Sequence, residues 1–209
     1  MAKIDFTKEL KYLYRPSASV FDVVDVPPMS YLMLDGHGDP NTAAEYAQAV
    51  EALYATAYRI KFISKDELEK DYVVPPLEGL WWAEDMASFT AARDKSAWDW
   101  TMMIMLPGWI SPELYQRALG EVRQKKALPG LQKIRMERYH EGLSAQILHI
   151  GSYDDEGPVL ARLHQEWLPQ QGYVEHGKHH EIYLSDARRV EASKLKTVLR
   201  QPIRKLADR

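Results

Sequence analysis

The sequence predicts an α+β fold made of two similar strand–helix–strand–strand modules with antiparallel sheets. Three observations support this prediction. Short apolar runs end at glycine or proline, as strands do. A longer stretch repeats apolar residues at three- and four-residue spacing, as amphipathic helices do. The same order of elements occurs in both halves of the chain, which is typical of an internal repeat. We expect a single domain over residues 1–209, with module one at about 20–110 and module two at about 130–205.

Module one begins with the apolar run SYLMLDG, a predicted strand that ends at glycine. The amphipathic helix that follows can start either at Asp39 with Pro40 or at Thr42 with Glu45, which match a capping box. The runs GLWWA and WDWTMMIML predict two more strands, and Ser111 precedes a second predicted helix as its cap. The expected elements are strands at 30–36, 79–83 and 98–106 and helices over about 42–63 and 112–126.

Module two repeats this order, after residues 1 to about 20 have been set aside as a polar lead-in. The runs IRMERYH and LSAQILHIG predict a hairpin around Glu141 and Gly142. A helix carrying Val159 and Trp167 follows, then the strands HHEIYLS and LKTVLRQPI. Across the halves, GLWWA corresponds to EIYLS and WTMMIML to TVLRQPI. The predicted strands are 134–140, 143–151, 179–185 and 195–203.

Composition narrows the function classes. The formal net charge is -3, from 27 basic and 30 acidic residues, so no broad positive surface is expected and nucleic-acid binding is not predicted. The chain has no cysteine, which excludes disulfides and thiolate catalysis. No long apolar segment indicates a signal peptide or a spanning helix, so we expect a cytoplasmic protein that is not bound to a membrane. The 6 Trp and 12 Tyr residues suit either a ligand pocket or an ordinary core.

The stretch HHEIYLS contains the first candidate site. Strand alternation places Glu181 and Tyr183 on one face and Ile182 and Leu184 on the other. We expect Ile182 and Leu184 to pack against the helices. Glu181 is interpreted as a solvated residue, as the partner of a cationic ligand or as a base acting on water. Tyr183 either packs or donates a hydrogen bond to a ligand carbonyl that gains charge.

The tryptophan-rich strands of module one supply further candidates. Gly79 corresponds to Glu181 and leaves space opposite it, and Trp81 corresponds to Tyr183. Trp82 is then expected to point toward the helices, although a register slip of one residue would exchange the two tryptophans. Trp100 and Met102 share a face of the next strand, where they form either the walls of a pocket for a flat apolar ligand or ordinary core.

Histidines offer weaker signals. His149 precedes the turn at Gly151, where it either bonds the helix start or contacts a ligand. Alternation sends His179 and His180 to opposite faces, and no carboxylate or cysteine has the spacing of a known metal motif. No glycine-rich phosphate loop and no nucleophile elbow is present. We therefore expect no metal and no cofactor.

Four stretches resemble the GyrI-like small-molecule-binding family: PLEGLWW, WDWTMMIMLP, EGLSAQILHIGSYDDE and HHEIYLSDARR. The resemblance covers roughly residues 20–205 and is most specific in the second half. It implies two strand–helix–strand–strand modules around a central ligand cavity. In family members fused to a helix-turn-helix, the resemblance implies binding of lipophilic cations beside a buried glutamate. Stand-alone members include a gyrase inhibitor and enzymes that hydrolyse cyclopropane-bearing alkylating compounds.

We expect this chain to resemble the stand-alone branches, and its Trp-rich strands are most similar to the hydrolase-related one. The predicted function is binding of a small aromatic or lipophilic molecule, with possible hydrolysis of cyclopropane-bearing genotoxins. Under that hypothesis Glu181 positions or deprotonates water, Tyr183 bonds the carbonyl oxygen, and Trp81 and Trp100 sandwich the ligand. The alternatives are a non-catalytic multidrug-binding protein and a gyrase-modulating protein, for which no stretch of the sequence singles out an interaction surface.

Overall fold

The computed structural model describes residues 3–84 and 94–206. The chain divides into two compact units, which are taken separately below. Unit 1 consists of Met1–Glu9 and Pro28–Tyr139, and unit 2 consists of Leu10–Pro27 and His140–Arg209. Unit 2 is therefore assembled from two segments that are far apart in the sequence.

Unit 1 contains an antiparallel sheet in the order β5-β2-β4-β3. Strands β2, β3 and β4 are rich in aromatic and other apolar residues. β4 is buried along most of its length, and β2 is buried along its middle. Asp99 and Trp82 face each other at one end of the β3–β4 ladder, so the tryptophan-rich run lies in register with the start of β4. The strands are β2 (Met29–His37), β3 (Leu77–Trp82), β4 (Asp99–Leu106) and β5 (Arg135–Tyr139).

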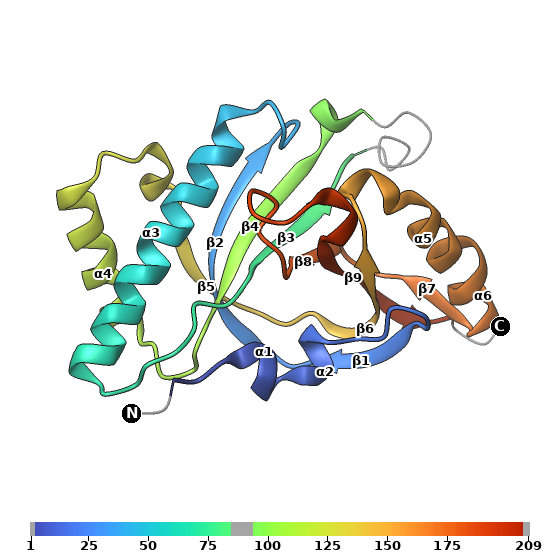
Figure 1. Ribbon diagram of the computed structural model, residues 1–209, viewed down its shortest axis with the longest axis horizontal. Coiled ribbons are helices and arrows are strands. Elements are labelled where there is room, and N and C mark those ends of the chain that lie inside the picture. Colours follow the sequence, from blue (N-terminus) through green and yellow to red (C-terminus); the bar gives the residue numbers. More distant parts are fainter. Residues whose placement is uncertain (1–2, 85–93, 207–209) are drawn as a thin grey trace. The chain divides into compact units, whose positions relative to one another are not determined.

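The long helix α3 packs on β2 and β4, and α4 lies beside it, as Figure 1 shows on the left. Ser111 caps α4 as predicted, because its Oγ accepts a hydrogen bond from the Leu114 amide at 3.2 Å. The capping box predicted at Thr42 is wrong: α3 begins after Ala43, which makes no side-chain cap. The helical segments are α1 (Phe6–Glu9), α3 (Ala44–Glu67), α4 (Pro112–Lys125), η2 (Lys95–Ala97) and η3 (Pro129–Gln132).

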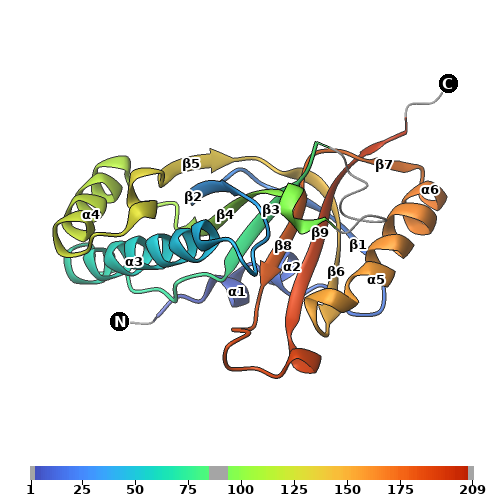
Figure 2. The same ribbon diagram turned by 90° about the horizontal axis from the view of Figure 1, so that it is seen from above.

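Unit 2 contains a second antiparallel sheet in the order β1-β6-β9-β8, and the short β7 pairs with the far end of β9. Figure 2 shows β8 and β9 running side by side toward the loop that joins them. The first strand, β1, was not predicted from the sequence. The strands are β1 (Asp22–Val26), β6 (Gly142–Ile150), β7 (Tyr173–Glu175), β8 (His179–Tyr183) and β9 (Lys196–Lys205).

The helical part of unit 2 is interrupted by a π-helix. The segment from α5 to α6 carries the predicted apolar residues, but its middle turn, η5, is wound as a π-helix. Such turns are rare and are found frequently at functional sites. The helical segments are α2 (Lys11–Tyr14), η4 (Tyr153–Asp155), α5 (Gly157–Arg162), η5 (Leu163–Trp167), α6 (Leu168–Gln170) and η6 (Ala192–Lys194).

The two units repeat one topology. In unit 1 a strand and a helix are followed by two strands that pair in the order β2-β4-β3. In unit 2 the same positions give β6-β9-β8, with β7 as an addition before β8. The predicted α+β class with repeated strand–helix–strand–strand modules and antiparallel sheets is confirmed.

Two further local predictions are wrong. β5 and β6 do not form a hairpin at Gly142, because β5 pairs with β2 in unit 1 while β6 pairs with β1 and β9 in unit 2. The start of the chain is not a polar lead-in either. Leu13 and Tyr14 in α2 are fully buried, since this short helix turns its apolar side into unit 2.

Candidate ligand-binding site

Strand β8 in unit 2 alternates as predicted. His180 and Ile182 are fully buried, whereas His179, Glu181 and Tyr183 lie on the opposite face and keep some exposure. The two adjacent histidines therefore point to different surroundings. This separates a polar face, which contains the predicted site, from a second face that belongs to the interior of unit 2.

The Glu181 carboxylate has a different neighbour at each oxygen. The Tyr183 hydroxyl donates a hydrogen bond of 2.6 Å to Oε2. The His179 Nε2 lies 3.4 Å from Oε1. Both side chains are largely removed from water, with 10% of His179 and 16% of Glu181 exposed. These contacts fix the carboxylate on one side and leave its second oxygen beside an imidazole.

The Tyr183 hydroxyl is engaged in a way that the sequence did not predict. A phenol has one hydrogen to donate, and here that hydrogen goes to Glu181. To donate the predicted hydrogen bond to a ligand carbonyl, Tyr183 would have to give up its hydrogen bond to Glu181. In the structure, Tyr183 positions the carboxylate.

Tyr153, in η4, adds a second phenol to this face. Its ring meets the Tyr183 ring edge-on, with the ring centroids 5.7 Å apart. Burial raises the pKa of Tyr153 to about 12, and the negative charges of Glu181, Glu156 and Asp186 add to this effect. The Tyr153 phenol therefore keeps its proton at neutral pH and remains available as a hydrogen-bond donor near these carboxylates.

The helical segment from α5 to α6 covers the face of the sheet that carries Glu181. The prediction that the aliphatic residues of β8 pack against the helices is therefore wrong. Glu181 lies opposite Leu199 on β9, and opposed residues in a sheet share a face. Ile203 follows Leu199 at an even spacing along β9, on that same face, and packs against Leu163 and Leu168. Glu181 and Tyr183 therefore lie on the helix side of the unit 2 sheet.

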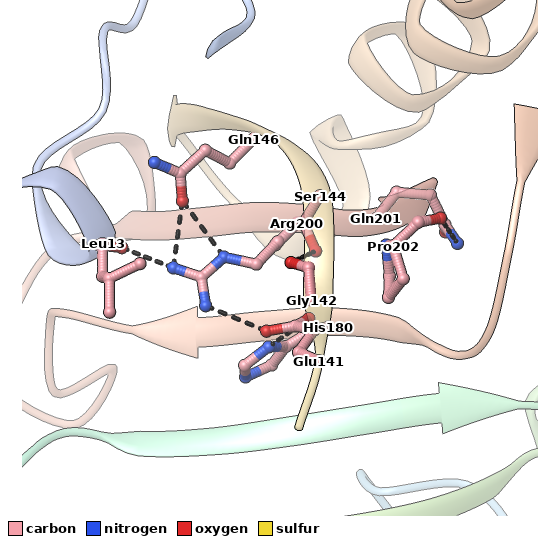
Figure 3. A network of polar contacts seen from close by, with 9 residues as sticks. All are labelled: Leu13, Glu141, Gly142, Ser144, Gln146, His180, Arg200, Gln201 and Pro202. Atoms are coloured by element: carbon pink, nitrogen blue, oxygen red, sulfur yellow. Dashed lines mark hydrogen bonds and ion pairs between the residues drawn. The ribbon is translucent and has the colours of Figure 1, made fainter. Parts of the chain in front are cut away.

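The opposite face holds a buried ionic network (Figure 3). The Arg200 guanidinium donates to the side chain of Gln146 at 2.9 and 3.0 Å, to the Leu13 carbonyl at 2.6 Å and to Glu141 at 3.1 Å. His180 completes the network through Nδ1, which lies 2.9 Å from Glu141. Burial would raise the pKa of Glu141, but His180 and Arg200 hold it at about 2. This cluster connects α2, β6, β8 and β9, so we assign it to the stability of unit 2.

Two tryptophans of unit 1 also lie on the helix side of their sheet. Trp81 and Trp100 lie opposite each other on β3 and β4, and both contact Tyr46 of α3, with ring centroids 6.3 and 5.3 Å away. Trp81 therefore points toward the helix, and the expectation that Trp82 would do so is wrong. Gly36 makes room for Trp100, because a Cβ built there would lie 2.1 Å from the indole ring.

Gly79 and Met102 form the next opposed pair on this helix-facing side of the unit 1 sheet. Met102 and Trp100 have no exposed surface, and Trp81 is 3% exposed. In this structure the three side chains are part of the core. Their contact with a ligand stays a prediction, and it requires their surface to be uncovered.

Comparison with known proteins identifies the family of the chain. Residues 20–204 match the GyrI-like small molecule binding domain family. The chain belongs to the GyrI-like family. Two crystal structures of Listeria innocua proteins are similar over 97% of this chain and 100% of their own. One, an uncharacterized conserved protein, is 38% identical with a TM-score of 0.88, and the other, a hydrolase, is 37% identical with a TM-score of 0.86.

A more distant structure shares the fold alone. The C-terminal domain of EcmrR is 10% identical with a TM-score of 0.54, over 89% of this chain and 98% of that domain. No curated protein sequence matches the chain. The family identity makes this chain a small-molecule-binding domain.

His149, a predicted ligand-binding residue of this GyrI-like chain, lines a surface pocket. His149 is buried, and its Nε2 donates to the Ser152 carbonyl at 3.0 Å, so its predicted bond near the helix start is present. The pocket has a volume of about 290 Å³. It is lined by Ala18, Ile147, Leu148, His149, Ile150, Val159 and Arg162. His149 is thus held by the turn while part of it borders an open volume.

Neither a metal centre nor a membrane segment emerges from the described part of the chain. Within residues 3–84 and 94–206, no cluster of three histidine, aspartate or glutamate side chains could hold a metal ion. In the same ranges, no helix is both long and apolar enough to cross a bilayer.

Sequence reasoning missed two members of the candidate site. His179 was considered only as part of a metal motif, although its alternation with Glu181 already placed the two side chains on one face. Tyr153 comes from a different part of the chain, and no spacing links it to Tyr183. An aromatic residue beside a predicted helix start was the only signal available for it.

Proposed function

We propose that this GyrI-like chain hydrolyses small, flat electrophiles that carry a cyclopropane ring, and that this activity protects the cell from alkylation. The observation that carries the proposal is the largely buried Glu181 carboxylate, held on one oxygen by Tyr183. The similarity to a Listeria innocua hydrolase at 37% identity over nearly the whole chain supports it.

The proposed reaction adds water across a strained bond. Water oxygen bonds to the ring methylene, and the carbon–carbon bond of the ring breaks. Its electron pair moves through the conjugated system to the carbonyl oxygen, which then takes up a proton. Glu181 supplies the negative charge on which activation of the water depends. The neutral Tyr153 phenol, near Tyr183, is a donor for the oxygen that gains charge.

The test is turnover of a panel of cyclopropane-bearing alkylators, with the ring-opened product identified by mass spectrometry. We expect turnover by the wild-type protein and a loss of at least about 100-fold in Glu181→Gln. Glu191→Gln is the matched control, because Glu191 is an exposed residue of unit 2 that pairs with Lys194. Absence of product across the panel would contradict the hydrolase.

A non-catalytic multidrug-binding function is the second candidate, and one observation favours it. Among the residues that the structure describes, no lysine or arginine pairs with Glu181. A partly buried carboxylate without a basic partner gains from a cationic ligand. Tight binding of lipophilic cations that is lost in Glu181→Gln, with weak binding of neutral analogues of the same shape and no turnover, would favour this function.

A further inference from the structure

The His179 imidazole is nine-tenths buried, and neither of its ring nitrogens has a hydrogen-bond partner among the described residues. A buried polar group left in this state costs about 1–3 kcal/mol. Native proteins satisfy most such groups, so an exception inside a candidate site needs an explanation.

The Glu181 carboxylate presents its oxygen Oε1 to this imidazole. The distance from Oε1 to Nε2 is 3.4 Å, while Tyr183 holds Oε2 at 2.6 Å. A base whose second nitrogen faces a fixed carboxylate is oriented for proton transfer. The distance exceeds that of a normal hydrogen bond. Such contacts are often long in the absence of a ligand and shorten when it binds.

We propose that His179 is the general base of the site, that Glu181 orients it, and that Tyr183 fixes the carboxylate. The inference rests on the proposed hydrolysis and assigns its proton acceptor. In this arrangement Nε2 carries the hydrogen and points to Glu181, which leaves Nδ1 unprotonated. The Nδ1 nitrogen is buried and without a hydrogen-bond partner within the described residues, so it can accept a proton from water.

The proton and the electrons then balance. Nδ1 takes one proton from water as the oxygen forms its bond to the ring methylene. The ring carbon–carbon bond breaks, and its electron pair reaches the carbonyl oxygen. The imidazolium returns its proton to solvent, and the carbonyl oxygen takes one up, so that one water is added to the substrate. Glu181 stabilises the imidazolium and stays ionised.

The other titratable groups around His179 are compatible with this cation. His164 in the π-helix η5 has its Nδ1 3.1 Å from Glu175 on β7. Burial and the neighbouring His179 lower the pKa of His164, against the opposing effect of Glu175. His164 and the Tyr153 phenol are thus both uncharged at neutral pH. Glu181 is then the charge beside the imidazolium, and it is of the stabilising sign.

The kinetic test compares His179→Phe, which keeps a ring of similar shape, with His179→Gln, which keeps a hydrogen-bonding group. We expect kcat to fall at least about 100-fold in His179→Phe while KM changes less than about twofold. His179→Gln should lose a comparable factor in kcat, because a side-chain amide forms hydrogen bonds but does not accept a proton from water. His37→Gln is the control, since His37 is exposed in unit 1 and contacts Asp99.

A second measurement does not depend on activity. Long-range ¹H–¹⁵N spectra of the full chain report which ring nitrogen carries the hydrogen. We expect the Nε2–H form in the wild type and a mixed population in Glu181→Gln. Turnover that persists in His179→Phe would overturn the assignment and leave the hydrolase in place. If the wild type shows no turnover and His179 is the Nδ1–H form, both the hydrolase function and the role of His179 are overturned. If it shows no turnover but His179 is the Nε2–H form, the His179–Glu181 pair is supported and the hydrolase function is overturned.

Discussion

The Tyr183 hydroxyl holds one oxygen of Glu181, and removing this bond should affect chemistry more than folding. Hydrogen bonds to charged groups contribute about 1.5–3 kcal/mol, which corresponds to a factor of roughly 10–150. We expect Tyr183→Phe to lower kcat/KM by about 10-fold or more, while the unfolding midpoint stays within a few degrees of the wild type. Tyr58→Phe, at an exposed position on α3, is the control in steady-state kinetics. Equal activity of the two variants would mean that the bond of 2.6 Å has no part in the reaction.

The Tyr153 phenol gives a pH prediction at the same scale. Burial and three neighbouring carboxylates raise its pKa to about 12 from an ordinary value of 10. Because the raised pKa means that the folded state holds this proton more tightly, Tyr153 should ionise only above the pH at which exposed tyrosines do. The difference in tyrosinate absorbance between wild type and Tyr153→Phe, measured from pH 9 to 12.5, should appear at the top of that range. A difference already complete near pH 10.5 would contradict it.

At the scale of elements, the β2–β4 pair depends on a glycine. A Cβ at Gly36 would lie 2.1 Å from the Trp100 ring, and that ring is enclosed by the core. We expect Gly36→Ala to lower the free energy of unfolding by about 1–3 kcal/mol or more, since overpacked cores must shift backbone or rotamers. Gly120→Ala in α4 is the matched control, because a Cβ there meets nothing within 4 Å. Helix propensity should make that change neutral or stabilising by up to about 1 kcal/mol.

Some of these elements could be predicted from the sequence, and the reason differs for each. The alternation of HHEIYLS separates two faces on its own, because successive side chains on a strand point in opposite directions. It does not state which face a helix will cover, so Glu181 and Trp81 were assigned to the side away from the helices. The same limit applies at Gly142, where strand partners chosen elsewhere in the chain exclude the predicted hairpin. The contact of Tyr153 with Tyr183 depends on tertiary packing, which no local spacing encodes.

At the scale of the whole molecule, unit 2 is built from the segments 10–27 and 140–209, which flank most of unit 1 in the sequence. The Arg200 network connects these segments through the Leu13 carbonyl. Breaking a buried ion pair by removing one charge typically costs about 3–5 kcal/mol, because the partner stays buried without compensation. Glu141→Gln should therefore destabilise unit 2 by about this amount.

Hydrogen exchange distinguishes a destabilisation confined to unit 2 from a general loss of stability. In Glu141→Gln, amide protection should fall in β6 and β9 before it falls in β2 and β4, since the network belongs to unit 2. Glu137→Gln is the control, because Glu137 forms an exposed pair with Arg135 that should contribute less than about 1 kcal/mol. Equal losses in both units would contradict the assignment of the network to unit 2.

The same network predicts how stability depends on acid. The pKa of Glu141 is lowered to about 2 from an ordinary value of 4.5, so the unfolded chain binds this proton more readily than the folded chain. The stabilisation from Glu141 is therefore complete above about pH 4.5 and is lost as the pH falls toward 2. Urea unfolding across this range should show the wild type losing stability steeply and Glu141→Gln losing it less steeply. Parallel curves for the two proteins would mean that Glu141 is not held ionised in the folded chain.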